Sequence, residues 1–184
     1  MKYEIKGGSF PVVVCYLNKG EQMITEKGSM VWQTTDFQME TTGGGLGKMF
    51  SKAFSGESMF QNIYTAGRDD AMIAFGSSFP GKILPLEITG GKEFILQKQA
   101  FLASTKGVDL SVHFSKKFGA GFFGGEGFIM QKLSGSGMAF VEIDGHVVEY
   151  HLNQGEQIIA DTGYVAMMDA TCSLDIVTIS GVKN

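Results

Sequence analysis

The 184-residue chain has few cysteines, few prolines and no long apolar run. Its two cysteines, Cys15 and Cys172, are too few for a disulfide framework or a four-thiolate zinc site. Both lie among apolar neighbours, which predicts buried free thiols and a reducing compartment. No stretch approaches the roughly 18 apolar residues of a membrane-spanning helix, and residues 1–6 lack the apolar core of a signal peptide. We therefore expect a soluble cytoplasmic protein.

Charge is also scarce, at 18% of residues, and the net charge is −4. This acidic balance counts against nucleic acid as a partner, because such binding relies on basic side chains that neutralise phosphates. Hydrophobic residues make up 43% of the chain, which is enough for one folded domain with its own core. The 26 glycines, set against three prolines, predict many tight turns between short strands.

The chain contains an internal repeat. The segment Leu17–Ile24 recurs 135 positions later as Leu152–Ile159, and a fainter copy lies between them at Ile88–Ile95. Gly76 and Gly145 also correspond, at a separation of 69 positions. Copies in a consistent order predict repeated structural units that pack against one another. We divide the chain into three related units, at about 1–55, 56–124 and 125–184.

Each unit has the pattern of β-strands joined by turns. Met138–Ile143 and His146–Leu152 flank Asp144 and Gly145, a strong signal for a two-residue hairpin turn. The hairpin predicts three cross-strand pairs: Ile143 with His146, Val141 with Val148, and Ala139 with Tyr150.

Further strands are expected at Phe10–Leu17 and Asp175–Ile179, and only Leu46–Phe54 could form a helical turn. The pattern predicts an all-β domain, as a compact sandwich or a coiled barrel with internal pseudo-threefold character.

Two glycine-rich segments resemble those of a known family. Thr42–Phe50 followed by Ser55–Phe60, and later Phe122–Phe128, are similar to the AIM-type mitochondrial-biogenesis family, named for altered inheritance of mitochondria. The resemblance covers nearly the whole chain, and many members are bacterial proteins of unknown function. It implies a double-stranded β-helix related to the tryptophan RNA-binding attenuator fold. For the mitochondrial relatives it implies a role in inner-membrane organisation and respiratory-complex integrity, with no known catalysis.

Longer family members continue past the third unit with another strand pair. The last unit of this chain is therefore expected to be incomplete, and its open edge would need covering by a neighbouring subunit. This predicts a homo-oligomer, as a trimer or a ring.

The glycine-rich loop does not match a nucleotide-binding loop. The Walker pattern needs four residues between its glycines and a Ser or Thr after the lysine. Here Gly43 precedes Gly47 and Lys48 by three intervening residues, and Met49 follows. We interpret the segment as a structural loop and expect no cofactor.

No catalytic or metal-binding group is recognisable. His146 and His151 are five positions apart, which places them on opposite faces of a strand, and His113 lies in another unit. Neither cysteine has a neighbouring histidine, and there is no nucleophile elbow. The acidic residues show no acid–base pairing; the ones considered are Asp69, Asp70, Glu126, Glu142 and Glu149. We assign no catalytic, cofactor or metal residue and expect a non-enzyme.

Two segments combine lysine with apolar side chains and are candidate interaction loops. Their residues are Lys48, Met49, Phe50, Lys52 and Phe54 in the first, and Lys116, Lys117, Phe118, Phe122 and Phe123 in the second. Projecting from one end, they could contact a membrane surface or a protein. The alternative is that the phenylalanines close the ends of the sandwich as core. Trp32, which aligns with Ala103 and Met167, is expected to be a core residue.

Three functions stay open. The first is a non-catalytic scaffold that acts on a membrane-associated or protein partner. The second, by analogy with the attenuator fold, is a ring that binds a small ligand or RNA. The third is an enzyme with an unrecognised site.

Overall fold

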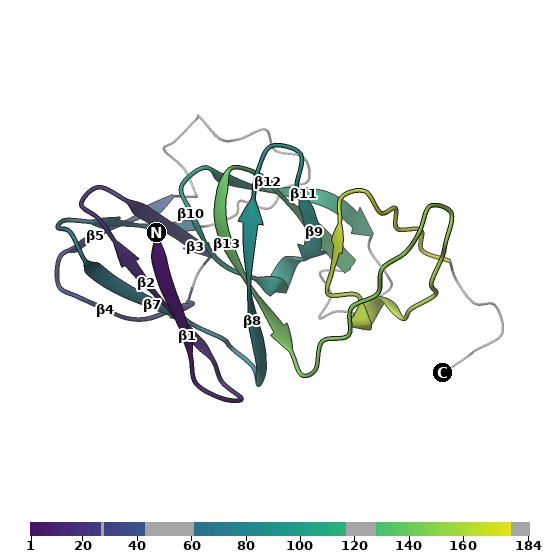
Figure 1. Cartoon of the computed structure of the whole chain (residues 1–184), viewed down its shortest axis with the longest axis horizontal. Helices are drawn as coiled ribbons and strands as arrows, with labels where there is room; N and C mark the ends of the chain where they lie inside the picture. The colour runs from purple at the N-terminus through teal and green to yellow at the C-terminus, as the bar shows by residue number, and fades with distance from the viewer. Residues whose placement is uncertain (27, 43–60, 117–127, 178–184) are drawn as a thin grey trace.

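The computed structural model describes residues 1–26, 28–42, 61–116 and 128–177, and its regular structure is almost entirely β-strand (Figure 1). The strands are β1 Lys2–Lys6, β2 Val12–Leu17, β3 Gln22–Glu26, β4 Met30–Gln33, β5 Phe37–Thr42, β6 Gln61–Ala66, β7 Ala71–Gly76, β8 Gly81–Ile88, β9 Phe94–Gln97, β10 Phe101–Thr105, β11 Val108–Lys116, β12 Phe128–Gly135, β13 Gly137–Asp144 and β14 Met167–Asp169. Two 3₁₀ turns, η1 Lys98–Ala100 and η3 Thr162–Tyr164, interrupt them. The prediction of an all-β protein is confirmed.

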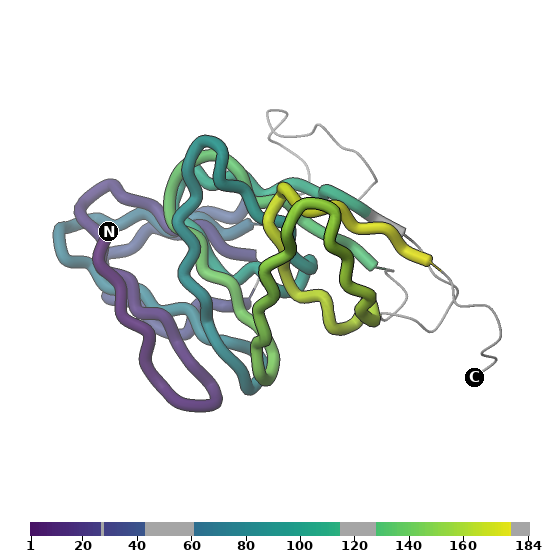
Figure 2. The backbone as a smooth tube through the Cα atoms, turned by 45° about the vertical axis from the view of Figure 1, so that its right-hand side comes forward, coloured from purple at the N-terminus to yellow at the C-terminus, as the bar shows by residue number. Residues whose placement is uncertain are grey.

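The strands form three antiparallel sheets. The first has the order β1-β2-β7-β4, the middle one β5-β6-β3-β10-β13-β8, and the third β11-β12-β9-β14. In Figures 1 and 2 the first sheet lies at one end of the molecule, and the third sheet lies at the other end with the C-terminal segment. No helix in the described part of the chain is long and apolar enough to cross a membrane.

The cores lie where neighbouring sheets face each other. β7 shows why the sequence packs this way: Ala71, Ile73, Ala74 and Phe75 are fully buried, so the strand is covered on both faces and is apolar almost throughout. Phe140 reaches into the same core from the middle sheet and meets the ring of Tyr3 edge-on at 5.1 Å. A second core joins the middle sheet to the third; among its members are Ile88, Phe94, Leu96, Leu133 and Val141.

The three repeated segments form the same tight turn. The turns span 18–21, 89–92 and 153–156, and in each the last backbone N–H donates to the first carbonyl, at 3.0, 2.9 and 2.9 Å. The third position of each turn is a glycine in the left-handed region, with φ of +84°, +103° and +85°, where a side chain is strained. The sequence repeat is therefore also a repeat of local structure.

Strand pairing follows the repeat as well. Counterpart positions of the first and second units are 71 residues apart from β2 to β5, so that β2, β3 and β4 correspond to β8, β9 and β10. The separation is 69 residues from β6 to β12 but 66 from β7 to β13, so the expected correspondence of Gly76 with Gly145 is wrong and Gly76 corresponds to Glu142. The pairs β2·β7, β3·β6, β4·β7 and β5·β6 recur as β8·β13, β9·β12, β10·β13 and β11·β12. Individual bonds recur too: Gly67 N donates to Asp36 O, and Ser136 N to Gly107 O, both at 2.8 Å.

The predicted hairpin across Asp144 and Gly145 is wrong. β13 lies between β10 and β8, so both of its edges are occupied. Its pairs Val141↔Leu84 and Ile143↔Lys82 replace the expected partners, and Ala139 pairs with both Leu86 and Ser104. Gly145, with φ +67°, instead turns the chain away from the sheet, and its N–H donates to Pro80 O at 2.8 Å.

The other local predictions have mixed outcomes. The strand expected at Phe10–Leu17 is present and begins at Val12. Residues 175–177 are not a strand, and 178–179 lie outside the described residues, as does the helical turn expected at Leu46–Phe54.

Candidate interaction surface

Most residues of the two lysine and phenylalanine loops lie outside the described residues. Lys116 is the exception: it ends β11, where its backbone pairs with Phe128. The outside positions are Lys48, Met49, Phe50, Lys52, Phe54, Lys117, Phe118, Phe122 and Phe123. Whether these loops contact a partner stays a prediction.

The cysteines and histidines are the side chains with the greatest chemical reactivity, and their surroundings differ. Cys15 is buried and free, and burial raises the pKa of its thiol to about 12. Cys172 is also free but only half-buried, so the prediction of a buried thiol is wrong there. All three histidines are exposed, and His151 Nε2 lies 3.8 Å from Glu149 Oε1. The described residues contain no group of three or more His, Cys, Asp or Glu that could hold a metal ion.

A pocket of about 260 Å³ lies between the β3–β4 turn and the β7–β8 loop, and Glu26 and Glu142 line it together with Phe79 and Phe101. Gln131 Nε2 donates to Glu26 Oε1 at 3.3 Å, and burial raises the pKa of Glu26. Glu142 Oε2 accepts from Ser77 Oγ at 2.9 Å and from Ser78 N at 2.6 Å. Both carboxylates already accept hydrogen bonds from protein groups, and the volume of the pocket is below the about 300–1,000 Å³ that is usual for organic ligands. We assign it no ligand.

The third unit contains two segments that have no strand partner in the described part of the chain. Residues 147–152 and 157–161 are the counterparts of β2 and β3, joined by the same turn, yet they belong to no sheet. Within the described part of the chain, no backbone hydrogen bond joins 146–152 or 157–160 to another segment. In the described part of the chain the backbone N–H and C=O groups of these two segments therefore have no strand partner, and unpaired backbone is a template for strand pairing.

The apolar side chains of these two segments are exposed to solvent, unlike their counterparts in the first unit. Val13 and Cys15 of β2 are 0% exposed, whereas their counterparts Val148 and Tyr150 are 64% and 66% exposed. Met23 is 0% exposed in β3, and its counterpart Ile158 is 51% exposed. Positions that are core in the first unit thus form an exposed apolar surface in the third. We call residues 147–161 the open hairpin; it consists of two segments joined by a tight turn, and the described residues show no strand pairing between them.

A second open edge lies on β4 of the first sheet. β4 has a neighbour on one side only, β7, and its Val31 and Trp32 are exposed. The prediction that Trp32 is a core residue is wrong because its counterpart Ala103 lies in β10, between β13 and β3, whereas no strand among the described residues pairs with the outer edge of β4.

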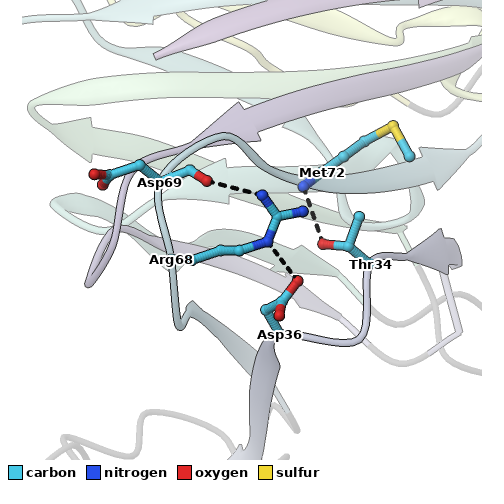
Figure 3. Close-up of polar contacts among 5 residues, drawn as sticks. All are labelled: Thr34, Asp36, Arg68, Asp69 and Met72. Atoms are coloured by element: carbon cyan, nitrogen blue, oxygen red, sulfur yellow. Dashed lines mark hydrogen bonds and ion pairs between the residues drawn. The ribbon is translucent and has the colours of Figure 1, made fainter.

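A polar cluster fixes the end of β4 (Figure 3). Thr34 N donates to Met72 O at 2.8 Å, and Met72 N donates to Thr34 Oγ1 at 3.3 Å. Arg68, the only arginine of the chain, donates from Nε to Asp36 Oδ2 at 2.7 Å and from Nη1 to the backbone O of Asp69 at 3.1 Å (Figure 3). These contacts hold β4 against β7, so its outer edge keeps a defined position.

Sequence reasoning predicted an incomplete last unit, which stays a prediction, and it did not single out residues 147–161. The repeat itself carried the missing signal: Val148, Tyr150 and Ile158 align with Val13, Cys15 and Met23. Apolar residues at core positions predict burial only when the strands that cover them are present.

Comparison with known proteins agrees with this fold. Over residues 3–184 the chain matches the family described as mitochondrial biogenesis AIM24. It is 32% identical over 168 residues to an uncharacterised protein of Streptococcus pyogenes serotype M6, a match that covers 85% of this chain and 66% of that protein. The X-ray crystal structure of a Streptococcus pyogenes protein matches with a TM-score of 0.60 and 28% identity, over 78% of this chain and 65% of that one. The chain thus spans just under two thirds of these relatives, and it belongs to the AIM24 family.

Proposed function

We propose that the protein is a non-catalytic assembly module, whose open hairpin is completed by a strand of another polypeptide. One observation carries this proposal: positions that are buried core in the first unit are exposed apolar positions in the third. Pairing of these unpaired segments with a strand of another polypeptide would satisfy their backbone groups and bury alternate side chains in one step.

A protein partner fits this surface better than a lipid surface does. Hydrocarbon can cover Val148 and Tyr150, but it offers nothing to the free N–H and C=O groups of the same segment. A strand covers both. The action on a membrane-associated partner, the cytoplasmic location and the attenuator-like double-stranded β-helix stay predictions.

The mass of the assembly in solution tests the proposal. We expect native mass spectrometry and light scattering to show a discrete oligomer, and the double variant Tyr150→Lys, Ile158→Lys to remain a monomer at the same concentration. Met39→Lys is the matched control, because Met39 is an equally exposed apolar residue on β5, away from the open hairpin. A monomeric wild-type protein that also recovers no partner from its native extract would overturn the proposal.

A further inference from the structure

The strand that completes the open hairpin can be identified from the rest of the molecule. We infer that it is β4 of a second copy of this chain, paired with residues 157–161 of the first copy. The inference rests on the proposed function and names its partner.

Consecutive units of this chain are joined by one kind of strand pair. β3 of the first unit pairs with β10 of the second, with Ile24 opposite Ser104. β9 of the second unit pairs with β14 of the third, with Ile95 opposite Met168. The flanking bond recurs as well, because Lys106 N donates to Gln22 O at 3.2 Å and Ala170 N donates to Glu93 O at 3.0 Å.

Among the described residues a third pair of this kind is missing, and neither of its two halves has a strand partner on that side. Residues 157–161 stand where β3 and β9 stand in their units, and β4 stands where β10 and β14 stand. Transferring the β3·β10 register through the repeat places Ile159 opposite Gln33, and transferring the β9·β14 register gives the same pair. Both transfers also predict the same flanking hydrogen bond, in which Thr35 N donates to Gln157 O.

The backbone of β4 is oriented for this register. Thr34 N donates to Met72 O, so the N–H and C=O of Thr34 face β7. Because backbone groups alternate along a strand, those of Gln33 face the open side, where the inferred pair with Ile159 needs them. β4 carries no charge, and Asp161, the only charged residue among 157–161, lies opposite the uncharged Val31 in this register, so no like charges face each other.

The pair requires a second copy. β4 lies at one end of the molecule, and the yellow-green segment that includes 157–161 lies at the other in both views (Figures 1 and 2). One chain cannot bring them together in this arrangement, whereas a neighbouring copy can offer its β4. Contacts of this head-to-tail type close into a ring when the rotation between copies allows it.

Disulfide trapping tests the register. Trp32 and Ala160 are opposite each other in the inferred pair at a non-hydrogen-bonded position, where Cα atoms are about 4.5 Å apart and a disulfide can form. Trp32→Cys and Ala160→Cys are made in separate chains, both with Cys172→Ser, then mixed and oxidised. We expect at least tenfold more covalent dimer than from either variant alone. The matched control replaces Ala160→Cys by Met39→Cys, and Gln33→Cys with Ile159→Cys serves if Trp32→Cys folds poorly.

Each result separates the inference from the proposed function. An oligomer whose mixed variants cross-link no better than the control overturns the inference and leaves the assembly proposal standing. Both cysteines placed in one chain give a second readout: a monomer with an internal disulfide would show that β4 and 157–161 meet within one molecule, and the second copy is then wrong. A wild-type monomer without any partner overturns both.

Discussion

Cys15 shows what burial does to a single reactive group. The thiol is completely covered in β2, and burial raises its pKa to about 12, so the thiol stays protonated at pH 8. Cys172 is half-buried outside any strand. We expect iodoacetamide to modify Cys172 and to spare Cys15 in the native protein, as read by mass spectrometry of the two peptides. Equal rates at the two sites would show that β2 opens easily.

Glu26 makes the stability of the fold depend on pH. Burial raises its pKa above the usual 4.5, while the Gln131 amide and the charge of Lys98 act in the opposite direction. A raised native pKa means that the native state holds the proton more tightly, so Glu26 stabilises the fold below pH 4.5, and this contribution is lost as pH rises through the native value.

Glu26→Gln keeps the acceptor for Gln131 and removes the charge. We expect this variant to unfold at a higher urea concentration than wild type at pH 7, and at the same concentration at pH 4. Glu87→Gln, on the exposed side of β8, is the control for losing a carboxylate. A variant that is less stable than wild type at pH 7 would contradict the pKa direction.

Single residues were predictable where neighbours along the chain decide their environment. The burial of Cys15 follows from the apolar run of β2. The prediction for Trp32 fails because β10 has a second neighbouring strand that β4 lacks. The alignment of the repeated segments does not show this difference in strand pairing.

At the scale of elements, the repeated turn offers an internal comparison. Gly20 and Gly155 have nearly equal φ, +84° and +85°, and an added Cβ would meet nothing within 4 Å at either site. Alanine at either position therefore carries the same local strain, about 1–2 kcal/mol.

The two substitutions should nevertheless differ in their effect on global unfolding. The Gly20 turn joins β2 and β3, which are both paired, whereas the Gly155 turn joins two unpaired segments that can relax. We expect Gly20→Ala to lower the free energy of unfolding by about 1–2 kcal/mol and Gly155→Ala by less than about 0.5 kcal/mol. Urea denaturation of dilute protein measures both. Equal losses would mean that the third unit is as firmly held as the first.

The turns themselves could be predicted from Asn-x-Gly-Glu and its fainter copy, since a left-handed position favours glycine. The hairpin at Asp144 and Gly145 could not. The turn signal is local, but β13 is bound on both edges by β8 and β10, and these long-range pairs outweigh it.

At the scale of the molecule, amide exchange reports whether the open hairpin has a partner. Below the concentration of association we expect the amides of 147–152 to exchange within seconds, while those of their counterpart β2 are protected by pairing with β1 and β7. Raising the protein concentration should slow the first set and leave β2 unchanged. Protection of 147–152 at the lowest concentration would reveal a partner inside the same chain.

The repeat in the sequence predicted that three units exist, and family resemblance suggested that the last is unfinished. Neither could say that units share sheets. That arrangement depends on the pairs β3·β10 and β9·β14, which join residues that are 80 positions apart (Ile24 and Ser104) and 73 apart (Ile95 and Met168).

Shared sheets also bear on how such a chain could arise. A protein made of one unit would have to form the β3·β10 type of contact between separate molecules, so a ring of identical short chains is the simplest ancestor. Tandem duplication and fusion of its gene would turn each of these contacts into a link within one polypeptide, at an effective concentration in the millimolar range or higher. In that history, the inferred pair of β4 with the open hairpin would be the one ancestral contact that the described part of the chain still makes between separate molecules.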